Sequence, residues 1–217
     1  IVLARLLSPE EYGIIAIVNV FILLANVFVQ SGLNTALIQK KDADEADFSS
    51  VFYLSLFISI VIYIVLFFAA PFIAEFYHNP QLIAVLRVLS IILFFGAINS
   101  IQNAYVAKAM LFKKLFFSSL WAIVISGSFG IATAYAGWGV WALVAQQIIN
   151  QLLITVILWF TVKWRPQLVF SIKKVSILFS YGWKLLASYI LNTLYTDMRT
   201  LVIGRVFSAS ILGFYNR

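Results

Sequence analysis

The sequence of 217 residues contains no cysteine, a single histidine and only 8 acidic residues. The lack of cysteine excludes disulfide bonds and thiolate metal sites in this chain. There is also no Walker A sequence, no HExxH, no Cys/His metal spacing and no serine nucleophile elbow. The single histidine, His78, lies in a polar turn, where we expect it to be solvated. We therefore expect no catalytic residue, no cofactor and no metal site, and we predict that the protein is not an enzyme.

Charge is scarce as well, because charged residues make up 11% of the chain and hydrophobic residues 63%. The mean hydropathy is +1.01. Soluble domains carry about 25% charged residues, so this chain could not cover its surface with polar groups in water. A lipid bilayer accepts such a composition in helical spans of about 20 residues. The composition therefore predicts an all-α, polytopic transmembrane helix bundle.

Apolar stretches of helical length occur throughout the chain. A first span ends at residues 1–6, and a helix start follows, with Ser8 as N-cap, Pro9 at the first helical position and Glu11 at the third. The chain begins with Ile1, so we expect a fragment that starts inside one span and stops just after another. The remaining predicted spans cover residues 11–36, 48–73, 82–107, 116–136, 140–162 and 184–206.

Residues 163–183 differ from the predicted spans. Lys163 to Pro166 should end the sixth span, and apolar residues then recur at helical spacing, with Lys173 and Lys174 off the apolar stripe. The pattern predicts an amphipathic helix on the membrane surface that joins two halves. We therefore divide the chain into an N-terminal lobe (1–162), a cytoplasmic-side connector (163–183) and the start of a C-terminal lobe (184–217).

The net charge of +7 indicates orientation, because most basic residues lie in loops after alternate spans. Short loops rich in lysine and arginine face the cytoplasm. The opposite loops hold only Arg5 and Arg205. The loops that we place in the cytoplasm contain Lys40, Lys41, Lys108, Lys113, Lys114, Lys163, Arg165, Lys173, Lys174 and Lys184.

Amide and hydroxyl side chains follow one helical face in three spans. Such groups need partners in hydrocarbon, so these faces are expected to look toward other helices or water. They could simply clamp helices together, which is the plainer interpretation of any single amide. For the set we favour a hydrated cavity with sugar-compatible donors and acceptors. The three rows are Asn19, Asn26, Gln30 and Asn34; Gln146, Gln147, Asn150 and Gln151; and Ser188, Asn192, Tyr195 and Arg199.

Three charged residues fall inside predicted spans. Arg87 lies near the start of the fourth span, where it could extend to the interface or face a cavity. Asp197 and Arg199 lie deeper and are two residues apart, a spacing that points them in different directions. Each is therefore expected to meet a partner on another helix. Arg199 could bind a substrate phosphate, and Asp197 could bind a coupling cation or proton, or both could form structural bridges.

The chain also contains an echo at an offset of 200 residues. Residues 1–14 read IVLARLLSPEEYGI and residues 201–214 read LVIGRVFSASILGF. The identical pairs are Val2/Val202, Arg5/Arg205, Ser8/Ser208 and Gly13/Gly213. Such an echo indicates an internal duplication, or it arises by chance between apolar sequences.

The segments ARLLSPEEYG (4–13), FVQSGLNTALIQKKD (28–42) and TDMRTLVIGRVFSASILGFY (196–215) resemble the bacterial polysaccharide biosynthesis flippases. These belong to the multidrug/oligosaccharidyl-lipid/polysaccharide exporter superfamily. The resemblance implies two six-helix lobes around a central cavity. The present chain would supply the first lobe and the first helix of the second.

The resemblance further implies alternating-access flipping of undecaprenyl-diphosphate-linked oligosaccharides across the bacterial inner membrane, for lipopolysaccharide or exopolysaccharide export. A polysaccharide polymerase and glycosyltransferases are possible partners, and nucleic acid is not expected. The family's cationic cavity would draw on Arg87 and Arg199. The remaining candidates for the cavity are Asn19, Asn26, Gln30, Gln147, Asn150 and Asn192, with Asp197 for ion coupling. A cation-coupled multidrug exporter and a non-transporting scaffold for glycosyltransferases are the alternatives.

Overall fold

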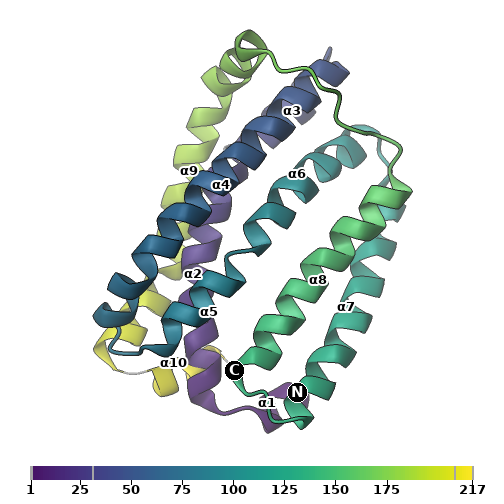
Figure 1. The fold of residues 1–217 in the computed structure, drawn as a ribbon. Helices are drawn as coiled ribbons and strands as arrows, with labels where there is room; N and C mark the ends of the chain where they lie inside the picture. Colours follow the sequence, from purple (N-terminus) through teal and green to yellow (C-terminus); the bar gives the residue numbers. More distant parts are fainter. Residues whose placement is uncertain (1, 31, 208, 217) are drawn as a thin grey trace.

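The computed structural model describes residues 2–30, 32–207 and 209–216, and this part of the chain is helical without β-strands. The helices run alternately up and down in one elongated bundle (Figure 1). They are α1 (Val2–Leu6), α2 (Pro9–Gln30), α3 (Leu33–Gln39), α4 (Glu45–Phe76), α5 (Gln81–Leu89), α6 (Ile92–Lys108), α7 (Phe112–Tyr135), α8 (Val140–Thr161), α9 (Ile172–Val206) and α10 (Ala209–Asn216).

Five helical segments are long and apolar enough to cross a membrane: α2, α4, α5 with α6, α7 and α8. The expected all-α bundle with several spans is therefore confirmed. The predicted start of α2 is also confirmed, because Ser8 and Glu11 form a reciprocal capping box. The expected span over residues 184–206 forms part of α9, which is not among the five. The charged residues Lys184, Asp197, Arg199 and Arg205 lower the apolar character of this helix.

Two predicted continuous spans are interrupted. Gly32 has φ +65°, a left-handed conformation that favours glycine, and it separates α2 from α3. At Ser90 the hydroxyl donates to the carbonyl oxygen of Leu86 at 2.6 Å, and the following amides bond three residues back. Serine bonding of this kind bends helices, and here it separates α5 from α6. The apolar pattern continues through both breaks, so it did not indicate them.

The predicted bounds of the helix over residues 163–183 are wrong, whereas its position on the membrane surface stays a prediction. Residues 162–171 are not helical, whereas Ile172 onwards forms the first turns of α9, which continues unbroken to Val206. Residues 164–171 instead run along the start of α4, because Trp164 is buried there and the amides of Gln167 and Ser171 donate to side chains of α4. The side chain of Ser171 caps this long helix by accepting from the amide of Lys174.

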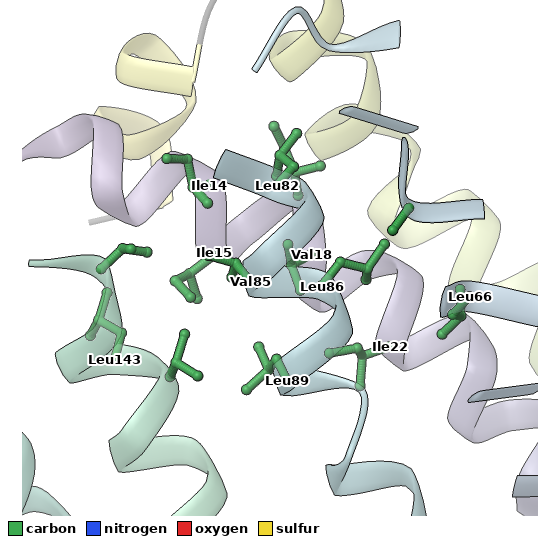
Figure 2. Packing of buried hydrophobic residues seen from close by; sticks show 14 of the residues in the cluster. Ile14, Ile15, Val18, Ile22, Leu66, Leu82, Val85, Leu86, Leu89 and Leu143 are labelled. Carbon is green, nitrogen blue, oxygen red and sulfur yellow. The ribbon is translucent and has the colours of Figure 1, made fainter. Parts of the chain in front are cut away.

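Apolar side chains of α2 and α5 form the centre of the larger packing cluster. Ile14, Ile15, Val18 and Ile22 interlock with Leu82, Val85, Leu86 and Leu89, and α4 and α8 contribute Leu66 and Leu143 (Figure 2). A second cluster lies toward the other end of the bundle and surrounds Trp164 of the connector. Because lipid is as apolar as these side chains, close van der Waals packing stabilises such clusters in a membrane.

Helices α2 and α10 make a reciprocal backbone contact. A Cβ on Gly13 would overlap the carbonyl oxygen of Ala209, and a Cβ on Gly213 would overlap that of Pro9. Gly13 and Gly213, like Pro9 and Ala209, stand 200 residues apart, which is the offset of the sequence echo. Each echoed segment therefore contacts the other through the same two positions. Ser208, which also belongs to the echo, lies outside the described residues.

The connector is attached to the start of α4 and to the turn before it, at the lysine-rich end of the bundle. The amides of Gln167 and Ser171 each donate at 3.0 Å to the hydroxyls of Ser49 and Ser50. The ammonium of Lys174 forms an ion pair with Asp44. That ammonium lowers the pKa of the Asp44 carboxyl to about 2, with help from the Asp47 amide. The same hydrogen bond raises the pKa of Lys174.

Candidate functional site

A polar cavity of about 370 Å³ lies between α2, α8 and α9. It brings together three residues that the sequence analysis selected from three separate spans, namely Asn19, Gln147 and Asp197. Thr200 and Tyr12 add hydroxyl groups to the wall, and the rest of the lining is mainly aliphatic. Asn19, Gln147 and Asp197 are each partly buried. Candidates from three separate spans therefore line one cavity.

The chemistry of this cavity suits a neutral polyol or a cation. The two amides can both donate and accept hydrogen bonds, and the carboxylate accepts them, so hydroxyl groups of a sugar would find both kinds of partner. A carboxylate oxygen is also a suitable ligand for a cation. Within residues 2–30, 32–207 and 209–216, no cluster of His, Asp and Glu could hold a metal ion.

Arg87 lies elsewhere, between α4 and α5. Its Nε donates at 3.2 Å to the carbonyl oxygen of Phe67, and its guanidinium lies 4.1 Å from the centre of the Phe67 ring. In a regular helix the amide of residue 71 would bond that carbonyl, but Pro71 has no amide hydrogen. Arg87 thus bonds a carbonyl that proline leaves free. This location favours a structural role over cargo binding.

Three further candidates are exposed rather than lining the cavity. Gln30, Asn192 and Arg199 all have exposed side chains. In the part of the chain that the structure describes, the ion pairs are Lys40–Asp47 and Lys174–Asp44, so neither Asp197 nor Arg199 forms the bridge that one interpretation expected. The two-residue spacing indeed points the two charges differently, with Asp197 toward the cavity and Arg199 away from it.

Two candidate amides hold helices together. The Nδ2 of Asn150 donates at 3.1 Å to Ser126 Oγ, which joins α8 to α7. Asn26 packs on the α6 backbone, since a Cβ on Gly96 would lie 2.8 Å from Asn26 Oδ1. Asn34 is carried by α3 beyond the break at Gly32, so the row that starts at Asn19 does not lie on one continuous helix.

Several further polar residues lie in the interior and were not among the candidates from the sequence. Thr200 lies three residues after Asp197, on the same helical face, and this spacing could have identified it. Asn99 and Gln102 of α6 are buried, and in the described structure their side-chain nitrogen and oxygen atoms have no hydrogen-bond partner. Their spacing of three residues inside an apolar span was the available signal. Buried amides without partners are uncommon, which makes this part of α6 a polar spot in the bundle.

Comparison with known proteins gives consistent results. The sequence model of a family described as "Polysaccharide biosynthesis protein" matches residues 2–217. The chain is 27% identical to the teichuronic acid biosynthesis protein TuaB of Bacillus subtilis, over 88% of the chain and 40% of that protein. It is also 27% identical to the succinoglycan biosynthesis transport protein ExoT of Rhizobium meliloti and to the lipopolysaccharide biosynthesis protein WzxC of Escherichia coli. Each match covers 99% of the chain and 44% of the relative.

The fold is similar to that of a multidrug resistance MATE family transporter of the MOP superfamily, solved in an inward-facing conformation. The TM-score is 0.68 at 14% sequence identity, and the match covers 99% of this chain and 54% of that structure. The chain thus spans less than half the length of the curated relatives it matches and about half of the solved transporter.

Proposed function

Since the chain belongs to the family of polysaccharide biosynthesis proteins, we propose that the full-length protein flips undecaprenyl-diphosphate-linked oligosaccharides across the bacterial inner membrane. It is a multi-pass membrane protein with at least five membrane-capable helical segments in this chain. The proposed activity is transport and not enzymatic catalysis. A lipid-linked saccharide is the proposed cargo, and the polysaccharide polymerase and glycosyltransferases are its proposed functional neighbours.

The observation that carries this proposal is the polar cavity between α2, α8 and α9. Asn19, Gln147 and Asp197 line this cavity. In the proposed mechanism the two amides bind sugar hydroxyls, and Asp197 accepts a proton or binds a coupling cation. Among the described residues, no arginine lines the cavity. The cargo diphosphate would therefore bind outside it, and the exposed Arg199 on α9 is the proposed partner.

Alternating access is the proposed mechanism, and the arrangement of the helices supports it. α9 and α10 contact α2 at one end of the bundle, and the connector attaches α9 to α4 at the other end. A movement of the C-terminal part relative to α2 would open or close the cavity, because Asp197 and Thr200 form one of its walls. The cavity, with both amides and the carboxylate, would then open first to one side of the membrane and afterwards to the other.

The test uses full-length protein in liposomes with a fluorescent undecaprenyl-diphosphate-linked oligosaccharide, read out by protection from an added glycosidase. Asn19→Leu and Gln147→Leu should each slow translocation by about tenfold, which corresponds to about 1.4 kcal/mol. The matched control is Gln30→Leu, because it removes an exposed amide from the same helix as Asn19. Equal rates in all three variants would contradict a role for the cavity.

A cation-coupled exporter is the second candidate, favoured by the carboxylate of Asp197 in the cavity wall. The same liposomes are therefore loaded with a cationic dye. Dye efflux that requires Asp197, without glycan translocation, would support the exporter instead. A non-transporting scaffold is distinguished by Arg199→Gln, which should abolish polysaccharide export from a flippase while membrane insertion is retained, whereas a scaffold should tolerate it.

A further inference from the structure

Two further cavities, which share no lining residue with the polar cavity, lie where α4 and α9 end beside each other. The first is an apolar groove of about 550 Å³ between the last turns of the two helices, lined by side chains such as Phe72, Phe76, Val202 and Val206. The hydroxyl of Tyr77 donates at 3.4 Å to the carbonyl oxygen of Leu201 and so links the two helices across the groove. Phe72 is 73% exposed and Val206 66% exposed, so the groove opens sideways from the bundle.

The second cavity, of about 440 Å³, adjoins the first and is polar. Both cavities share Tyr77 and Arg205. Arg205 and Glu10 both line the polar cavity and carry opposite charges. In the described part of the chain neither of them has an ion-pair partner, and the guanidinium of Arg205 lies over the Phe76 ring, 4.8 Å from its centre. An unpaired cation and an unpaired carboxylate thus face one polar space at the mouth of an apolar groove.

Two other titratable side chains near these cavities, His78 and Glu75, form no ion pair with Arg205 or Glu10 in the described part of the chain. His78 lines the polar cavity, and its Nδ1 lies 3.3 Å from the carbonyl oxygen of Phe76. Glu75 is exposed in the last turn of α4 and lines neither cavity. A ligand that complements the site therefore needs an apolar chain, an anionic group for Arg205 and a cationic group for Glu10.

We propose that this pair of cavities binds a zwitterionic phospholipid with a primary amine, of the phosphatidylethanolamine type. One acyl chain occupies the apolar groove, the phosphate pairs with Arg205, and the ammonium pairs with Glu10. Arginine suits the phosphate because its planar fork donates two hydrogen bonds. The end of α4, which is long and apolar enough to cross a membrane, is expected at headgroup depth, where both lipid charges are found. A purely anionic headgroup would leave Glu10 unpaired and beside a phosphate.

The experiment reconstitutes full-length protein in vesicles of equal parts phosphatidylethanolamine, phosphatidylglycerol and phosphatidylcholine, extracts it gently and identifies retained lipid by native mass spectrometry. Wild type should retain phosphatidylethanolamine preferentially. Arg205→Gln should lower retention about fivefold. Glu10→Gln should keep a bound phospholipid and lose the preference for the primary amine. Val202→Trp should fill the groove and displace the chain.

Arg5→Gln is the matched control, because Arg5 is the exposed counterpart of Arg205 at the offset of 200 and lines neither cavity. Equal retention in Arg205→Gln and Arg5→Gln overturns the proposal, as does retention without headgroup preference or no retained lipid. Melting temperatures of all variants identify any that fail to fold. The lipid-binding result and the glycan-translocation result test the two proposals separately, because the lipid site shares no lining residue with the polar cavity.

Discussion

At the scale of single residues, Arg87 illustrates why a charge inside a span need not bind cargo. Pro71 interrupts the hydrogen bonding of α4, and the freed carbonyl of Phe67 accepts from the Arg87 guanidinium on α5. An unsatisfied carbonyl in hydrocarbon costs several kcal/mol, so an arginine that bonds it offsets part of its own insertion cost. The guanidinium also stacks on the Phe67 ring, which keeps it in position.

Replacing Arg87 with leucine should destabilise the protein by about 1.5–3 kcal/mol, the range for a hydrogen bond to a charged group. In a Pro71→Ala background the loss should be smaller, because alanine at this position supplies an amide hydrogen to the Phe67 carbonyl. A double-mutant cycle of melting temperatures in detergent measures this coupling. Lys173→Leu, which removes an exposed cation, serves as the control. Additive effects of the two substitutions would argue against the pairing.

At the scale of helices, the α2–α10 contact depends on the absence of side chains. Gly13 and Gly213 let each backbone approach the other, at equivalent positions of the two echoed segments. Small residues allow such close helix approach in membranes. The same principle acts between α7 and α8, where Gly130 packs against Gln146. Gly130 thus brings α7 close to α8 in the same way.

Gly13→Ala and Gly213→Ala should each destabilise the protein by about 1–3 kcal/mol, the usual cost of overpacking, because the new methyl group meets backbone that cannot rotate away. Gly127→Ala is the matched control, since a Cβ there meets nothing within 4 Å and alanine favours a helix. Thermal unfolding of the full-length protein compares the three. If Gly13→Ala melts at the same temperature as Gly127→Ala, the close contact does not exist in the membrane protein.

At the scale of the whole molecule, the lysine-rich end connects α9 to the first part of the chain. Lys174 pairs with Asp44, and Gln167 donates to the Glu45 carboxylate. At the same end, Lys108 of α6 donates at 2.7 Å to the carbonyl oxygen of Lys40 and so joins α6 to the α3–α4 turn. Trp164 is buried among Phe48, Phe52 and Tyr105. Hydrogen bonds, charges and aromatic packing together hold the connector in place.

The Asp44–Lys174 pair predicts a pH dependence at this end. The folded-state pKa of Asp44, about 2, lies below its ordinary value of 3.8, so the stabilisation is present above pH 3.8 and is lost as pH falls toward 2. In the wild type, amide hydrogen exchange in residues 167–175 should therefore increase as the pH falls toward 2. In Asp44→Asn the exchange should already be increased at pH 7, and this further increase at low pH should be absent. The control is Asp42→Asn, an exposed carboxylate in the same turn. Identical exchange in both variants would exclude the proposed pairing.

Much of the helical arrangement could be predicted because long apolar runs and short polar turns determine where spans begin and end. The interruptions at Gly32 and Ser90 could not, since each depends on local backbone bonding inside an apolar run. For the cavity, the rows of polar side chains indicated Asn19 and Gln147, and the charge inside an apolar span indicated Asp197. The actual positions of Arg87 and Asn150 follow from the register of neighbouring helices, which one sequence does not determine. The cytoplasmic placement of the lysine-rich end stays a prediction.

The close contact between α2 and α10 is apolar, so the two ends of the bundle should respond differently to added salt. Added salt screens exposed charges within about 10 Å at 0.1 M, and so weakens the pairing of Lys174 with Asp44. The approach of Gly13 to Ala209 involves no charge and depends on shape alone. Higher ionic strength should therefore weaken the attachment of α9 at the lysine-rich end more than the contact between α2 and α10. The ion concentration beside the membrane would then determine which of the two contacts opens first.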